Sequence, residues 1–306
     1  MNHDAPVTAA ARIDMVEIYQ SNGRAACEER AFVLHAVGIA SDVAFTGHDW
    51  GLFVDSADAV NATTHLERYQ RENPPRRRFI RPEGTHAWAW LGAAAYASVV
   101  LAVAYLAGHR AFAANWLSAG VVDTAAVRAG EAWRVVTALT LHFDVGHLLA
   151  NLGFGTVFLW LAAQLLGPGI ALAAVLAAAS LANLLDTFLQ PADHVSAGAS
   201  TAVFATLGLL AAYAWRRRAD DGGRWAYRWA PLVAGVFLLA FTGAGGENTD
   251  VLAHLTGFVM GALAGVLLAM RRQAFGATAQ WLSGLAAAAL VALAWTVALA
   301  SGLGGQ

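Results

Sequence analysis

The sequence predicts an all-α polytopic membrane protein that carries a small α+β domain at its N-terminus. Apolar residues make up 58% of the 306 residues and charged residues only 13%, whereas soluble domains are about half apolar and a quarter charged. Residues 1–86 contain 21 of the 40 charged side chains. The remainder forms apolar stretches near the roughly 20 residues that cross a bilayer. We therefore divide the chain into an α+β domain (1–73), a Pro/Arg-rich linker (74–86), a six-span core (87–272) and a seventh span with a tail (273–306).

The first domain is expected to have the element order β-α-β-β-α. Residues 14–20 alternate like a strand, Ser21 and Asn22 are suited to cap a helix that ends near His35, two strand-like runs follow, and a second helix covers 57–72. This order resembles short ferredoxin-like signalling domains of bacteria, which implies an unidentified partner. No signal peptide precedes it, so we expect it in the cytoplasm. The single cysteine, Cys27, excludes an internal disulfide and a cysteine-based zinc site.

The membrane part is expected to contain seven spans, with the N-terminus inside and the C-terminus outside. The spans are 88–108, 147–166, 169–190, 198–215, 230–246, 251–270 and 281–302. Arginine clusters lie before the first span, between the fourth and fifth, and after the sixth, which places these segments on the cytoplasmic side. The long connection 109–146 is too interrupted to span and is expected in or on the outer leaflet. The net charge of −2 argues against nucleic acid as a partner.

Four polar side chains stand where polar groups are costly. His147 and Asn151 open the second span, Ser200 opens the fourth and His254 opens the sixth. Under the predicted topology these three spans all run from outside to inside. Asn151, Ser200 and His254 follow acidic residues of the outer face by four to seven positions, which corresponds to a depth of about 6–10 Å. The sequence therefore predicts that these groups lie at one level of the membrane, where ionisable residues are usually functional.

Spacing within the spans indicates how these groups meet. His147 and Asn151 are four residues apart and share one helix face. Gly257, Gly261 and Gly265 give the sixth span a flat stripe on which another helix can pack closely. If the fourth span packs there, Ser200 and His254 come within reach of each other. Gly198 permits a tight entry into the fourth span.

This set of residues suits nucleophilic attack on a peptide carbonyl. A serine hydroxyl is a weak nucleophile until a base takes its proton, and the pKa of a histidine suits it to be that base. Asn151, His147 and the backbone N–H of Ser200 are placed to donate hydrogen bonds to the oxyanion that forms. No acidic residue is placed to orient His254, so we expect a Ser-His dyad.

The motifs resemble those of the rhomboid intramembrane serine proteases over roughly residues 88–270. The matching residues are the pair Trp133-Arg134, the pattern H-x4-H-x3-N of His142, His147 and Asn151, the G-x-S motif of Gly198 and Ser200, and the A-H-x-x-G-x-x-x-G motif of His254, Gly257 and Gly261. The resemblance implies a six-helix core in a cytoplasmic membrane, with transmembrane proteins as substrates. It also implies Ser200 as nucleophile, His254 as base, and His147 and Asn151 around the oxyanion.

Two positions depart from the family pattern. Thr201 follows the nucleophile where Gly or Ala is frequent, and Phe204 stands where many members have a tyrosine that packs on the catalytic histidine. The ring is kept, so we expect the stacking to survive. The seventh span is an addition to the six-span core.

Other interpretations remain open at this level. Ser200 and Asn151 are also compatible with helix packing, and Trp133-Arg134 with an interfacial anchor. A catalytically inactive relative that binds transmembrane clients is the main alternative. A transporter, or a zinc site of His142, His147 and His254, is a second one, although the chain has neither an internal repeat nor an H-E-x-x-H motif. We expect no metal and no cofactor.

Overall fold

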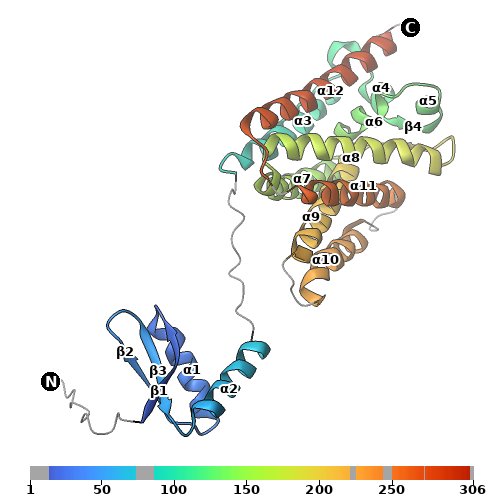
Figure 1. Ribbon diagram of the computed structural model, residues 1–306. Helices are drawn as coiled ribbons and strands as arrows, with labels where there is room; N and C mark the ends of the chain where they lie inside the picture. Colours follow the sequence, from blue (N-terminus) through green and yellow to red (C-terminus); the bar gives the residue numbers. More distant parts are fainter. Residues whose placement is uncertain (1–13, 74–85, 221–224, 244–249, 272, 304–306) are drawn as a thin grey trace. The chain divides into compact units, whose positions relative to one another are not determined.

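The computed structural model describes residues 14–73, 86–220, 225–243, 250–271 and 273–303. The chain divides into two compact units, Met1–Ile80 and Arg81–Gln306, which are described separately (Figure 1). The division falls inside the predicted linker 74–86, which lies outside the described residues apart from His86. The predicted arginine clusters lie partly outside them too: Arg76, Arg77, Arg78, Arg81, Arg224 and Arg272.

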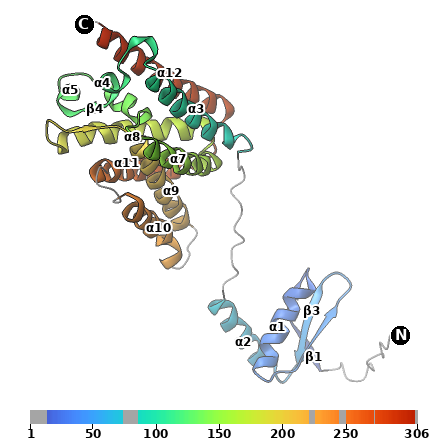
Figure 2. The same cartoon turned by 180° about the vertical axis from the view of Figure 1, so that it is seen from behind.

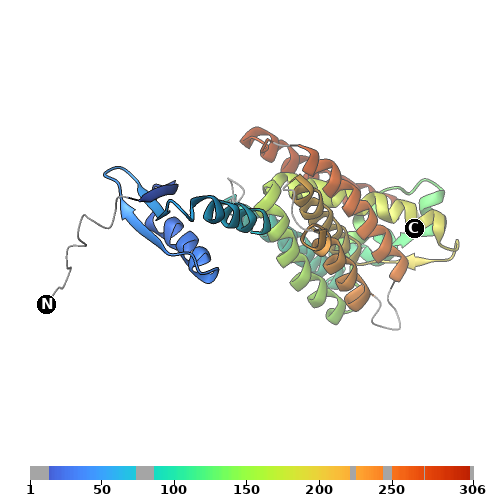
Figure 3. The same ribbon diagram turned by 60° about the horizontal axis from the view of Figure 1, so that its bottom comes forward.

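The first unit has the predicted β-α-β-β-α order. Its elements are β1 (Met15–Ser21), α1 (Arg24–Ala36), β2 (Ser41–Phe45), β3 (Trp50–Asp55) and α2 (Ala59–Glu72). The strands form an antiparallel sheet in the order β1-β3-β2, and both helices contribute to one core against it. Figure 3 shows the helices and strands of this unit in a second view. That core is built from Cys27, Leu34, Ile39, Leu52, Val54 and Ala62.

The predicted cap of α1 is wrong in detail. Ser21 is the last residue of β1, and the residue that precedes the helix is Gly23, which has no side chain to cap it. The Ser21 hydroxyl instead accepts a hydrogen bond from the Gly23 N–H at 3.3 Å. The strand extends one residue further than its alternation indicated, because Ser21 still pairs with Trp50 of β3.

The second unit consists of long helices joined by one connection of short elements. The long helices are α3 (Ala89–Gly108), α7 (Val145–Leu166), α8 (Pro168–Leu189), α9 (Ser200–Asp220), α10 (Trp225–Gly243), α11 (Val251–Met270) and α12 (Ala277–Leu303). The short elements are η2 (Ala111–Ala113), α4 (Trp116–Gly120), β4 (Val122–Asp123), α5 (Thr124–Arg128), α6 (Arg134–Thr137) and η3 (Ala138–Thr140). The pairing of β4 with β5 (Val195–Ser196) ties this connection to the segment between α8 and α9 (Figure 2).

Six of these helices are long and apolar enough to cross a membrane, judged by length and composition over the described residues: α3, α7, α8, α10, α11 and α12. Large apolar side chains such as Phe237, Phe241 and Leu267 are more than half exposed. A surface of this kind requires lipid around it. The second unit is therefore a multi-pass membrane domain.

The predicted fourth span is a helix, α9, but it falls short of these six in apolar character. It contacts α7, α8, α10 and α11, so little of its surface needs to be compatible with lipid. Buried threonines such as Thr201 and Thr206 and the arginines near its C-terminus lower its apolar character. Thr206 satisfies its hydroxyl by donating to the Ala202 carbonyl at 2.7 Å.

Helices α9 and α11 run parallel with their backbones in close contact. A Cβ atom added to Gly257 would lie 2.6 Å from the carbonyl oxygen of Thr201, and one added to Gly261 or Gly265 would overlap the carbonyl oxygen of Ala205 or Leu209. The predicted glycine stripe on the sixth span therefore does receive the fourth span.

Helix α12 contacts the rest of the unit through hydrogen bonds near its N-terminus and ring packing nearer its C-terminus. Gln280 accepts hydrogen bonds from the N–H groups of Gly169 and Ile170 at the start of α8, each at 3.0 Å, and donates to the Leu166 carbonyl at 2.7 Å. Trp295 packs on Trp116, with ring centroids 4.5 Å apart. The additional helix is thus part of the packed domain.

Replacing Gly261 with alanine should weaken the domain by about 1–3 kcal/mol, because the added methyl group collides with backbone that has no rotamer to change. The matched control is Gly153→Ala in α7, where a Cβ meets nothing within 4 Å. Thermal unfolding of the purified protein in detergent measures both. Equal midpoints for Gly261→Ala and Gly153→Ala would contradict the packing described for α9 and α11.

Candidate active site

The predicted reactive groups line one cavity of about 890 Å³. Ser200, His254, His147 and Asn151 are all part of its wall, as is Phe204. Ser200 is the first residue of α9, His147 the third of α7 and His254 the fourth of α11. The N-terminal ends of three helices therefore meet at this cavity, and their partial positive charge favours anions there.

The ring of His147 and the hydroxyl of Ser200 both lie close to Gly198. Its N–H donates to the Ala138 carbonyl at 3.0 Å, which fixes the segment that leads into α9. A Cβ atom added at Gly198 would lie 2.6 Å from Cε1 of His147 and 3.3 Å from Oγ of Ser200. Only glycine fits between these two side chains, so this position is required by close approach.

Asn151 is oriented by His142. Its side chain is buried, and its Nδ2 lies 3.1 Å from Nε2 of His142. The same Nε2 faces the backbone N–H of Ala199 at 3.4 Å. Two donors require an acceptor, so His142 is the neutral tautomer with its proton on Nδ1. Burial, with a smaller contribution from His147, lowers the pKa of His142 to about 4. One hydrogen of the Asn151 amide remains available for the cavity.

His254 is buried under the ring of Phe204. It is 6% exposed, and the two ring centroids lie 4.3 Å apart with a 36° tilt. The stacking expected from the ring at position 204 is present. Thr201 packs its methyl group toward Gly257, at 3.2 Å from where a Cβ would lie. Its β-branch therefore occupies the contact between α9 and α11.

Trp133 and Arg134 lie outside this cavity. Arg134 pairs with Glu131 at 2.6 Å and donates to the carbonyls of Ser118 and Val121 at 2.9 and 3.0 Å. Trp133 donates to the Ala119 carbonyl at 3.3 Å. Both residues line a smaller cavity of about 160 Å³ beside α12. Their contacts hold the connection between α3 and α7 in its folded form.

The motifs and their arrangement agree with the comparisons to known proteins. Residues 129–271 match the model of the rhomboid domain. The chain therefore contains a rhomboid domain. Its rhomboid domain is 31% identical over 145 residues to rhomboid-like protease 2 of Toxoplasma gondii, covering 46% of this chain and 50% of that one. It is 32% identical over 135 residues to rhomboid-like protease 3 of the same organism, covering 43% and 49%. The chain spans about half the length of these curated relatives.

The matched stretch contains every candidate site residue that the sequence predicted. It begins before Trp133 and ends after Gly261. The first unit, α3 and α12 lie outside it. The rhomboid domain as folded here therefore depends on helices beyond the matched stretch, since α12 contacts α8 and α6, and α3 contacts α7 and α8.

Asp144 and Asp250 were interpreted from the sequence only as charges of the outer face, and His194 was given no role. Asp144 accepts a hydrogen bond from the N–H of His147 at 2.7 Å and so caps α7. Asp250 caps α11 by accepting from Ala253 at 3.0 Å. Nε2 of His194 donates to Oδ2 of Asp250 at 2.9 Å. An aspartate directly before an apolar run is a signal for a helix N-cap. The sequence has this signal at Asp144 and at Asp250, so both caps could have been predicted.

Acidification should destabilise the rhomboid domain through His142. Its pKa is about 4 when folded and near the ordinary 6.5 when unfolded, so the unfolded chain binds more protons between these values. The stabilisation is present in full above pH 6.5 and is lost as the pH falls toward 4, with a slope of at most about 1.4 kcal/mol per pH unit. Thermal midpoints from pH 7.5 to 4.5 measure this.

The control for this titration is His142→Gln, whose side-chain oxygen accepts the same hydrogen bonds and does not titrate. Its midpoint should depend less on pH than that of the unchanged protein. The same pH dependence in both proteins would show that other groups are responsible.

Proposed function

We propose that the protein is an intramembrane serine endopeptidase that cleaves transmembrane proteins with a Ser200-His254 dyad. The observation that carries the proposal is the single cavity at the N-terminal ends of α7, α9 and α11, lined by both dyad residues and by His147 and Asn151. The protease names of the relatives support the same reaction class.

The dyad accounts for the chemistry as follows. The Oγ of Ser200 attacks the peptide carbonyl while the imidazole of His254 takes the hydroxyl proton and then passes it to the leaving amine. Water hydrolyses the acyl-enzyme ester by the same route in reverse. The carbonyl oxygen becomes an oxyanion, toward which Asn151, His147 and the N–H of Ser200 donate.

We propose a dyad that does not include Asp250 as a third member. The nearest acidic residue in the sequence, Asp250, has both carboxylate oxygens engaged elsewhere. One accepts from Ala253 and from Gln190, at 3.0 and 3.2 Å, and the other contacts His194 at 2.9 Å. The ring of Phe204 stacks on the imidazole and helps to orient it.

The substrate is a transmembrane segment that unwinds near the outer end of the bundle. A helical peptide bond is shielded by its own hydrogen bonds, so weak helix formers are expected at the cleaved site. Helix α10 is the least buried of the six candidate spans, which makes its side the access route. We also propose that the protein lies in a cytoplasmic membrane, as the resemblance to the rhomboid proteases implies, with a cytoplasmic N-terminus and an external C-terminus, which the arginine distribution supports. We also propose that the first unit is a ferredoxin-like domain and that it binds a partner.

Ser200→Ala should abolish cleavage of a transmembrane substrate and labelling by a fluorophosphonate probe, because both require the nucleophilic oxygen. The control is Ser180→Ala in α8, since the buried Ser180 hydroxyl has no partner among the described residues and does not line the cavity. Gel-based labelling and a cleavage assay in proteoliposomes measure the two properties. Retained cleavage in Ser200→Ala would refute the proposal. Absence of labelling and cleavage in the unchanged protein would favour the inactive client-binding relative.

Asn151→Ala should lower kcat for such a substrate by about 10²–10³ while KM changes little, since the lost hydrogen bond forms mainly in the transition state. Steady-state kinetics in detergent or liposomes provide both constants. A rise in KM with kcat unchanged would assign Asn151 to substrate binding and remove it from the oxyanion.

A further inference from the structure

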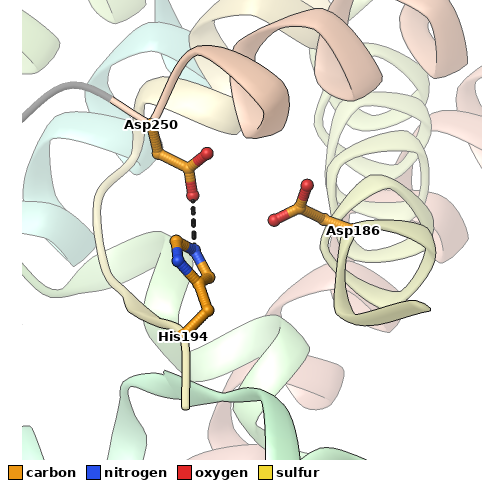
Figure 4. A group of neighbouring side chains, drawn as sticks. All are labelled: Asp186, His194 and Asp250. Carbon is orange, nitrogen blue, oxygen red and sulfur yellow. Dashed lines mark hydrogen bonds and ion pairs between the residues drawn. The ribbon is translucent and has the colours of Figure 1, made fainter. Parts of the chain in front are cut away.

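Three ionisable side chains meet beside the active-site cavity, in a group that the proposed reaction does not use. Asp186 lies in the last turn of α8, His194 in the segment between α8 and α9, and Asp250 immediately before α11. One potential ligand atom from each lies within 4.8 Å of the others. Figure 4 shows the Asp186 carboxylate directed toward the pair formed by His194 and Asp250.

Of these three side chains, Asp186 is the one whose burial no hydrogen bond or ion pair explains. It is 2% exposed, and its Oδ1 has no hydrogen-bond partner among the described residues. A buried carboxylate oxygen without a partner is costly, and such groups are usually paired or bound to a metal. The nearby Arg128 directs its guanidinium to the carbonyls of Thr187 and Gln190 at 2.8 and 2.9 Å. No ion pair of Asp186 with a basic side chain occurs in the part of the chain that is described.

The side chains of His194 and Asp250 are held in place by surrounding hydrogen bonds. Oδ1 of Asp250 accepts from the Ala253 N–H and from Gln190. This leaves Oδ2 toward Nε2 of His194 at 2.9 Å. Two ligands of a tetrahedral zinc ion, each about 2.0–2.2 Å from the metal, lie about 3.3 Å apart. The spacing of these two atoms is therefore close to that of a zinc ligand pair, and hydrogen bonds of this kind orient metal ligands.

We propose that Asp186, His194 and Asp250 bind a divalent transition-metal ion of the zinc class. One imidazole nitrogen and two carboxylate oxygens suit zinc, with a water molecule in the fourth position. Calcium and magnesium prefer sites made only of oxygen ligands. The ion takes the place of the proton between His194 and Asp250, so binding releases a proton or moves it to Nδ1. This site is distinct from the alternative of His142, His147 and His254, and it departs from our expectation of no metal.

The site links the segments that carry the dyad. His194 precedes Gly198 and Ser200 in the same segment, and Asp250 lies one helical turn before His254. His194 and Asp250 also line the cavity that contains the dyad. A bound ion therefore ties the end of α8 to the starts of α9 and α11 and stabilises the folded domain. The inference stands whether or not Ser200 is a nucleophile.

The test uses the purified full-length chain in detergent, with any affinity tag removed and chelator dialysed away. Zinc sulfate is titrated by calorimetry, and thermal midpoints are recorded with and without zinc. We expect one zinc ion per chain and a midpoint that rises with zinc concentration, since the ion binds the folded state. Asp186→Asn and His194→Gln should each weaken zinc binding by about tenfold or more. Asp193→Asn, which alters an exposed neighbouring carboxylate, should bind as the unchanged protein does.

Two results would overturn the inference. One is zinc binding and a thermal shift of equal size in the unchanged protein and in His194→Gln, which means that zinc binds elsewhere. The other is a shift of the same size with calcium or magnesium as with zinc. If Asp186→Asn does not fold, His194→Gln decides alone, because His194 is partly exposed in a loop and its replacement disturbs packing little.

Discussion

The contact between the backbones of α9 and α11 is the constraint on which the rest of the membrane domain depends. Helices in lipid gain little from the hydrophobic effect, so they associate by close packing. Here the glycines of α11 bring it against the carbonyl oxygens of α9 along three successive turns. The two helices run parallel and begin beside the same cavity. The start of one carries Ser200 and the start of the other carries His254, so the packing itself determines that these groups share a site.

Much of this arrangement could be predicted from the sequence because it depends on short-range patterns. Apolar length identified the long helices, and a four-residue glycine repeat identified the surface on which α9 packs. Alternation and turn residues identified the strands of the first unit. The fourth span was predicted too, although α9 is not among the six helices apolar enough to be candidate spans, but its enclosure by other helices was not predicted. Its surroundings, and not its composition, make it a membrane helix, and a search along the chain does not reveal which helix is enclosed by the others.

The side-chain contacts that could not be predicted are formed by residues far apart in the chain. Asp186, His194 and Asp250 come from three separate segments, and no spacing rule connects them. The acceptor role of His142 depends on the N–H of Ala199, which only the fold brings near. Trp133 and Arg134 match a family motif, yet their hydrogen bonds go to carbonyls of the preceding connection. A motif gives residue identity, whereas the partners of each side chain follow from tertiary structure.

The enclosed position of α9 has a consequence for biosynthesis. A segment that has three arginines in its C-terminal part and begins with Ser-Thr partitions poorly into lipid when it emerges alone from the ribosome. Its neighbours α7 and α8 precede it in the chain, whereas α10 and α11 follow. Stable insertion of α9 therefore waits for later helices to be synthesised. Integration into the bilayer and assembly of the cavity are then one event, so Ser200 and His254 do not share a site in an incompletely inserted chain.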